Sequence, residues 1–137
     1  MSARHVMLIS CILVAVPASA QRDTLAQEQC FKVASHAEAR ACLEAQSKQS
    51  DLALKKAESS LRSALAQWDQ ETQYKSRSTA QVERAAATFQ RYRESQCEFQ
   101  ASLAAGGNGS GDRRLLCHIE LNRRRVAELQ AAQASLQ

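Results

Sequence analysis

The chain contains almost no residues that interrupt a helix. Its single proline is Pro17, and its four glycines all lie between positions 106 and 111. In a helix interior, proline and glycine cost about 3 and about 1 kcal/mol relative to alanine, so long stretches without them can remain helical. Alanine, glutamine, glutamate, arginine and leucine, which are good helix formers, make up much of the remainder. We therefore expect an all-α fold: a small antiparallel helical bundle of three longer helices and a short N-terminal helix.

The start of the chain has the composition of an export signal. A short positive stretch is followed by an apolar run over residues 6–16, and Pro17 then precedes the Ala-Ser-Ala sequence of residues 18–20. This order is typical of a cleaved secretory signal peptide. The apolar run is shorter than the about 20 residues that a membrane-spanning helix needs. We expect a signal peptide over residues 1–20 and a single helical domain over 21–137, periplasmic or secreted and without a transmembrane segment.

Cys11 allows a second interpretation of the same segment. Residues 8–11 resemble a lipobox, in which the cysteine becomes the lipidated first residue of the mature protein. However, the apolar run continues past Cys11, whereas a cleavage site should follow that run. Cleavage after Ala20 is the preferred interpretation, and a lipoprotein anchored through Cys11 is the alternative.

An even number of cysteines remains in the expected mature chain: Cys30, Cys42, Cys97 and Cys117. In a short exported protein this indicates a disulfide framework. Three pairings are possible, and we favour Cys30–Cys42 with Cys97–Cys117, because each bridge then joins neighbouring segments across a turn. A zinc site is the competing interpretation, but there is no Cys-x-x-Cys, and His36 and His118 are the only histidines left as ligands. We expect no metal and no cofactor.

The first bridge requires a bend in the chain. Twelve residues of straight helix between Cys30 and Cys42 would extend about 18 Å, whereas a disulfide needs Cα atoms within about 7 Å. Ser35 and Glu38 have the spacing of a capping box, which starts a new helix. We expect a short helix before this point and a long one after it.

Hydrophobic spacing predicts the longer helices over about residues 37–75, 79–104 and 113–135, with a break at 76–78 and a flexible connector at 106–111. Each helix has an apolar stripe with steps of three and four residues, which we expect to form the core. The stripes are Leu54, Ala57, Leu61, Ala64 and Trp68; Ala85, Phe89, Tyr92, Phe99 and Leu103, interrupted by Gln96; and Leu115, Ile119, Val126 and Leu129, interrupted by Asn122.

Charge and motifs exclude several classes of function. Of the 18 basic residues Arg4 lies in the signal, so the mature chain has 17 basic and 14 acidic residues, a net charge of +3. The dense basic patch of a nucleic-acid-binding protein is absent. So are the sequence motifs of serine hydrolases, metalloproteases and dinucleotide-binding enzymes. We expect neither nucleic-acid binding nor enzymatic activity.

Three segments together carry a family resemblance. They are Phe89-x-x-Tyr92-Arg93-x-x-x-Cys97, the pair Gly106-Gly107, and Cys117-x-x-x-Leu121-Asn122-x-x-Arg125-x-x-x-Leu129. This pattern resembles the lysozyme inhibitor LprI-like family of small exported bacterial proteins, and the resemblance covers about residues 26–130. The chain departs from the family at Phe89, where tryptophan is usual, and at Asn122, where threonine is common. After Asp51-x-x-Leu54 the family's asparagine and tyrosine are replaced by Lys55 and Glu58.

The candidate partner-binding residues are Arg93, Arg125, Tyr92, Gly106 and Gly107. The two guanidiniums could be presented to a partner carboxylate or to an anionic glycan. The structural alternative is that they pair with acidic residues of this chain, for which the candidates are Glu94, Glu98, Glu120 and Glu128. Tyr92 and Phe89 also have the spacing of core aromatics, and Asn122 could fix helix register through a buried hydrogen bond.

The resemblance implies an exported binding protein of the bacterial envelope, with a lysozyme as its partner. Inhibition would work by occlusion, with a rigid helix end or the glycine connector entering the glycan cleft. A net charge of +3 gives no long-range attraction to a basic lysozyme, so either the acidic half before Tyr74 would have to face the enzyme or the target is another hydrolase. The alternative is a structural or interaction module that binds another envelope protein or cell-wall glycan.

Overall fold

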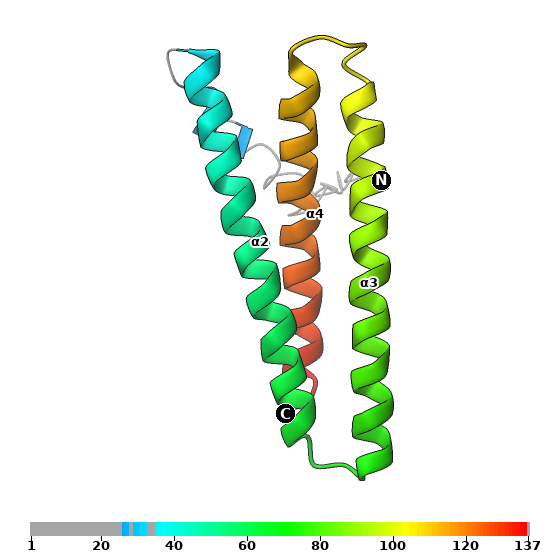
Figure 1. The fold of residues 1–137 in the computed structure, drawn as a ribbon. Coiled ribbons are helices and arrows are strands. Elements are labelled where there is room, and N and C mark those ends of the chain that lie inside the picture. The colour runs from blue at the N-terminus through cyan, green and yellow to red at the C-terminus, as the bar shows by residue number, and fades with distance from the viewer. Residues whose placement is uncertain (1–25, 28, 33–34, 137) are drawn as a thin grey trace, which may run out of the picture.

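The computed structural model describes residues 26–27, 29–32 and 35–136. Its regular elements are the helices α2 (His36–Gln67), α3 (Thr72–Ser102) and α4 (Gly109–Ala134), and no strand occurs in this part of the chain. Figure 1 shows the three helices side by side, with α4 between α2 and α3; α2 and α4 run in the same direction, and α3 runs antiparallel to both. α4 packs against both neighbours, whereas α2 and α3 contact each other far less. The predicted all-α bundle is confirmed, while the predicted signal peptide lies outside the described residues.

The capping box predicted at Ser35 is present and starts α2. The Ser35 backbone N–H donates to a Glu38 carboxylate oxygen at 3.1 Å, and the Glu38 N–H donates to the Ser35 hydroxyl at 3.3 Å. These two bonds satisfy donors that a helix start would otherwise leave unpaired. Before this point, Ala26, Gln27, Gln29 and Cys30 have helical backbone, which is all that is described of the predicted short helix.

The corner between α2 and α3 lies at residues 68–71, and the predicted break at 76–78 is wrong. Trp68 leaves the helix with φ −60° and ψ 133°, and its half-buried side chain packs against the core. The indole packs against the core at this point, and the chain turns directly after it. Residues 76–78 are therefore regular helix inside α3. Serine is only mildly unfavourable in a helix and arginine is a good helix former, so the two serines at 76 and 78 do not suffice to break it.

The connector between α3 and α4 is shorter than predicted. α4 begins at Gly109, four residues before the predicted start, so Gly109 and Gly111 are helical. The reversal is made at Ala105 and Gly106, which have positive φ angles of 49° and 79°. A left-handed residue after the end of a helix is a common stop signal. The loop over residues 103–108 is therefore a tight turn rather than a long flexible linker.

The buried apolar residues form two clusters separated by a polar layer. One cluster lies towards the corner at 68–71 and consists of Leu54, Ala57, Leu61, Leu65 and Leu129. The other lies at the opposite end and consists of Ala26, Cys30, Leu43 and Ile119. Between them, α2 buries Ser47 and Ser50, and α4 buries Asn122. The predicted stripes of α2 and α4 are thus the observed core faces, with Ala64, Trp68, Leu115 and Val126 half-buried.

The predicted core stripe of α3 is largely wrong. Tyr92, Phe99 and Leu103 are each more than half exposed, and Ala85 is exposed as well. The residues of α3 that are buried are Cys97 and Ala101. The disulfide from Cys97 to Cys117 fixes which face of α3 meets α4, and Tyr92 and Phe99 then point outward. Phe89 follows the prediction, since it is half-buried and packs against the core.

Candidate functional site

Figure 1 shows that α2 and α4 begin and α3 ends at the same end of the bundle. Both disulfides lie nearer to this end than to the other. Cys30–Cys42 ties the N-terminal segment to α2, with Cα atoms 5.5 Å apart. Cys97–Cys117 ties α3 to α4, with Cα atoms 5.4 Å apart. The pairing expected from sequence is the one observed. We call this part of the molecule the bridged end.

A second link joins α3 and α4 beside the Cys97–Cys117 bridge. Arg114 donates two hydrogen bonds to the carboxylate of Glu98, at 2.6 and 2.8 Å. These bonds lower the pKa of Glu98 and raise that of Arg114, so both groups stay charged. Disulfide and ion pair together hold the two ends of the 103–108 loop.

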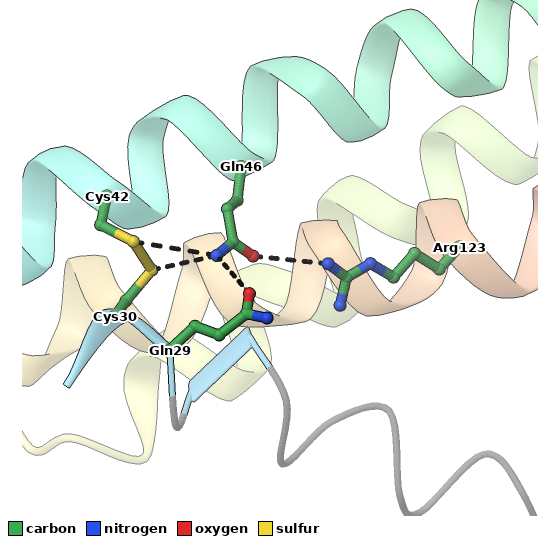
Figure 2. Close-up of a disulfide and its surroundings, with 5 residues drawn as sticks. All are labelled: Gln29, Cys30, Cys42, Gln46 and Arg123. Atoms are coloured by element: carbon green, nitrogen blue, oxygen red, sulfur yellow. Dashed lines mark hydrogen bonds between the residues drawn. A yellow bond between two sulfur atoms is a disulfide. The ribbon is translucent and has the colours of Figure 1, made fainter. Parts of the chain in front are cut away.

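Gln46 connects the first bridge to α4, as Figure 2 shows. Its side-chain nitrogen donates to the Gln29 side-chain oxygen at 3.3 Å and lies 3.2 Å from the Cys30 sulfur. Its oxygen accepts from Arg123 of α4 at 3.4 Å. One glutamine thus links the N-terminal segment, α2 and α4 next to the Cys30–Cys42 bridge.

The first turn of α4 contains a buried carboxylate, that of Asp112. Asp112 is 5 % exposed, lies 2.7 Å from His36 Nε2 and accepts from Arg40 Nη1 at 3.3 Å. The pKa of Arg40 is raised, first by its hydrogen bond to Glu44 and then by Asp112. Gly111 leaves the room that Arg40 needs, because a Cβ there would lie 2.0 Å from the same Nη1 atom. These contacts fix the start of α2 against the start of α4.

The polar layer is a hydrogen-bond network that joins all three helices. Arg93 Nη1 of α3 donates to Asp51 Oδ1 at 2.9 Å and to Asn122 Oδ1 at 2.6 Å. The Asn122 amide donates to Asp51 Oδ1 at 2.8 Å and to the Ser50 hydroxyl at 2.9 Å. Asn122 is fully buried, and the Arg93 side chain is 15 % exposed. Arg93 is therefore engaged mainly inside the bundle.

Arg125 lies close to the same network. It donates to Glu128 at 2.9 Å and is 19 % exposed. The Phe89 ring lies 6.0 Å from the Arg93 guanidinium carbon and 5.7 Å from that of Arg125. Phe89 thus provides cation–π contacts to both arginines. The Nε atoms of both arginines are buried without a hydrogen-bond partner in the described part of the chain.

The comparison with protein families decides what kind of protein this is. The sequence matches the lysozyme inhibitor LprI family over residues 19–129 of its 137. The chain belongs to this family. The LprI match spans both disulfides, the polar layer and the 103–108 loop. No curated protein and no solved structure matches the chain.

The structure distributes the candidate residues of this LprI chain over three places. Arg93 and Arg125 meet at Phe89 in the polar layer, whereas Tyr92 lies on the outer face of α3 and is 53 % exposed. Gly106 and Gly107 are both exposed in the 103–108 loop. The structure does not bring these five residues into one site.

Sequence reasoning missed the partner that holds Arg93. Glu128 was among the acids proposed for the arginines, and it pairs with Arg125. Asp51, which pairs with Arg93, lies 42 positions earlier on another helix, so no local spacing indicates it as the partner. A signal was available, since Asp51 precedes the core residue Leu54 by three positions and so lies near the packing face of α2.

Two types of site are not found within the described ranges 26–27, 29–32 and 35–136. No group of three or more His, Cys, Asp or Glu residues there could hold a metal ion. No helix there is long and apolar enough to cross a membrane.

Proposed function

We propose that this LprI-family chain is an exported protein that binds a lysozyme and inhibits it by occluding its glycan cleft. The observation that carries the proposal is the family match over residues 19–129, a family described as lysozyme inhibitors rather than enzymes. Two further observations support export. Disulfides such as the two at the bridged end form in oxidising compartments, and residues 1–20 have the order of a signal peptide.

The part of the molecule best suited to enter a cleft is the 103–108 loop. It joins the antiparallel helices α3 and α4 at the bridged end (Figure 1). Leu103 begins it with 51 % of its surface exposed, and Phe99 lies one helical turn earlier with 55 % exposed. Exposed apolar side chains beside small glycines offer a narrow surface that an enzyme cleft can bury.

Rigidity favours this loop as an inhibitory element. Its two ends are held by the Cys97–Cys117 bridge and by the Glu98–Arg114 ion pair. Ordering a loop on binding costs free energy, so a loop that is already ordered binds more tightly for the same contacts. The same rigidity would keep the loop from adapting to a cleft as a flexible substrate does.

Charge at this end is mixed and gives no attraction to a basic enzyme. Glu38 is exposed in the first turn of α2, but the exposed Glu44 is paired with Arg40, and Arg113 is exposed near the start of α4. The proposal therefore rests on the shape and rigidity of the loop and not on long-range attraction.

The test is inhibition of c-type, g-type and i-type lysozymes by the protein purified after export. The substrate should be a soluble N-acetylglucosamine oligosaccharide, so that binding of the protein to cell walls cannot imitate inhibition. We expect at least one enzyme to be inhibited at micromolar concentration, with binding visible by calorimetry. Unchanged rates with all three classes would overturn the proposal and favour the alternative, an interaction module for another envelope component.

A matched pair of variants tests the role of the loop. Leu103→Glu should abolish inhibition, because it places a charge at the centre of the proposed contact. Leu52→Glu is the control, since Leu52 is 60 % exposed on α2 and lies outside the loop. Equal inhibition by both variants would show that the 103–108 loop is not the inhibitory element.

A further inference from the structure

A groove with a volume of about 390 Å³ opens between α3, α4 and the segment at residues 26–27. This volume is within the range of small-molecule sites, which is roughly 300–1,000 Å³. Leu116, Leu121 and the bridged Cys117 supply apolar lining from α4. None of the lining residues belongs to the 103–108 loop, so the groove is separate from the surface proposed to inhibit lysozyme.

We propose that this groove binds a short saccharide that carries a carboxylate. One wall is a stripe on α3 that consists of Tyr92, Gln96 and Gln100, spaced by four residues each. Tyr92 is 53 % exposed, so its ring is available for stacking against the apolar face of a sugar. The two glutamine amides each provide donors and an acceptor, which match the hydroxyl and acetamido groups of amino sugars.

The other wall supplies the positive charge that selects an anion. It contains Arg113, Arg123 and Arg124, with Glu120 as the single acidic residue. Arg124 forms an ion pair with Glu120, and Arg123 is hydrogen-bonded to Gln46. Arg113 is exposed and forms no ion pair with any residue that the structure describes. Its planar guanidinium can bind a carboxylate through two parallel hydrogen bonds.

The third side of the groove depends on the first disulfide. Ala26 and Gln27 line the groove and belong to the segment that Cys30–Cys42 ties to α2. Gln46 reinforces this tie through Gln29 and reaches Arg123, which also lines the groove (Figure 2). Loss of the bridge should therefore loosen the segment and open the groove on one side.

The ligand chemistry that fits is an N-acetylated amino sugar with a carboxylate substituent. N-acetylmuramic acid combines an acetamido group, ring hydroxyls and a lactyl carboxylate in one residue. The apolar lining and Tyr92 match the ring, the glutamines match its polar groups, and Arg113 matches the carboxylate. The site would let the protein bind cell-wall glycan whether or not it inhibits a lysozyme.

The test is titration of the full exported protein with the soluble disaccharide of N-acetylglucosamine and N-acetylmuramic acid, followed by calorimetry and by NMR. We expect saturable binding, with resonances of Tyr92 and Gln96 among those that shift. Tyr92→Ala should weaken binding about tenfold, because the stacking face is lost, and Tyr92→Phe should retain it. Tyr74→Ala is the matched control, since Tyr74 is also on α3, is 49 % exposed and lies outside the groove.

Variants of the arginine wall and of the first disulfide test the proposal further. Arg113→Ala should remove most of the preference for this disaccharide over neutral di-N-acetylchitobiose, whereas the exposed Arg77→Ala should not. The double variant Cys30→Ala/Cys42→Ala should bind several-fold more weakly while circular dichroism shows that its helices persist. Absence of saturable binding at millimolar ligand, equal affinity for the neutral disaccharide, or equal losses in Tyr92→Ala and Tyr74→Ala would each overturn the proposal.

Discussion

Arg93 of α3 donates a 2.6 Å hydrogen bond to the side-chain oxygen of Asn122, a fully buried residue of α4. Ser50 and Asp51 of α2 accept from the amide of the same asparagine. A shift of one helix along another would leave these groups buried and unpaired, which is costly. The polar layer therefore fixes the register of the three helices, while the two apolar clusters supply most of the driving force for packing.

Replacing Asn122 should destabilise the bundle strongly. Asn122→Ala removes the buried hydrogen bonds that Asn122 makes with Arg93, Ser50 and Asp51 and leaves a cavity, so we expect a loss of about 2–3 kcal/mol in the free energy of unfolding. Asn122→Thr places a hydroxyl at this position, fills a similar volume and should lose about 1 kcal/mol. Urea denaturation followed by circular dichroism measures both values. Equal losses in the two variants would show that a hydroxyl of similar volume cannot replace any part of the role of the amide.

His118 should make the protein less stable in mild acid. Its pKa lies below the ordinary value of 6.5, chiefly because burial disfavours the charged imidazole and also because Arg93 and Arg114 are near, while Asp51 and Glu94 act in the opposite direction. Below about pH 6.5 the unfolded chain then binds more protons than the folded chain, so stability is lost as the pH falls through the folded pKa. His118→Gln should reduce the loss in stability between about pH 7 and pH 5. A pH dependence identical to that of the wild type would contradict this assignment.

Each disulfide should contribute similarly to stability, because the loops they close are of similar length. The separations are 12 residues for Cys30–Cys42 and 20 residues for Cys97–Cys117. The loop-entropy model gives a contribution of about 3 kcal/mol for each. Removing one bridge by a double cysteine-to-alanine substitution should lower the free energy of unfolding by about this amount. Thermal or urea unfolding under non-reducing conditions provides the measurement.

The turn after α3 contains backbone strain that a substitution can relieve. Ala105 has a φ of 49°, a region that L-residues other than glycine rarely adopt. Ala105→Gly should therefore stabilise the fold by about 0.5–1 kcal/mol. Gly106→Ala should destabilise it by about 1 kcal/mol through its φ of 79° alone, because a Cβ there meets no atom within 4 Å. Effects of the same sign in both variants would contradict the observed turn.

The fold class, the disulfide pairing and two of the three core faces were predictable from local features. Helix propensity and the capping box at Ser35 act over a few residues, and the stripes through Leu61 and Ile119 have a regular apolar period. The predicted core stripe of α3 was largely wrong because most of its apolar side chains are exposed. Arg93 is mostly buried because Asp51 and Asn122 satisfy it, whereas Tyr92 is exposed. Which of these two side chains is buried depends on contacts with helices that are distant in the sequence.

The helix boundaries show the same limit. The corner at 68–71 depends on where Trp68 docks against the core, and the early start of α4 coincides with the pairing of Asp112 to His36 and Arg40. No short sequence pattern around these residues indicates either contact. The groove beside Tyr92 could not be predicted from the sequence either, because its walls come from α3, α4 and the segment at 26–27.

The two disulfides have a topological consequence. Cys30–Cys42 closes a loop within the N-terminal segment and α2, Cys97–Cys117 closes one within α3 and α4, and no bridge among the described residues joins these halves. α2 is held to α4 by packing, hydrogen bonds and ion pairs, and among the described residues the 68–71 corner is the one covalent connection between the two halves. Opening that corner would let α2 exchange onto the α4 of a second copy, giving a domain-swapped dimer with every native disulfide intact. The two disulfides therefore constrain each half of the molecule covalently but place no such constraint on which copy of α4 packs against α2.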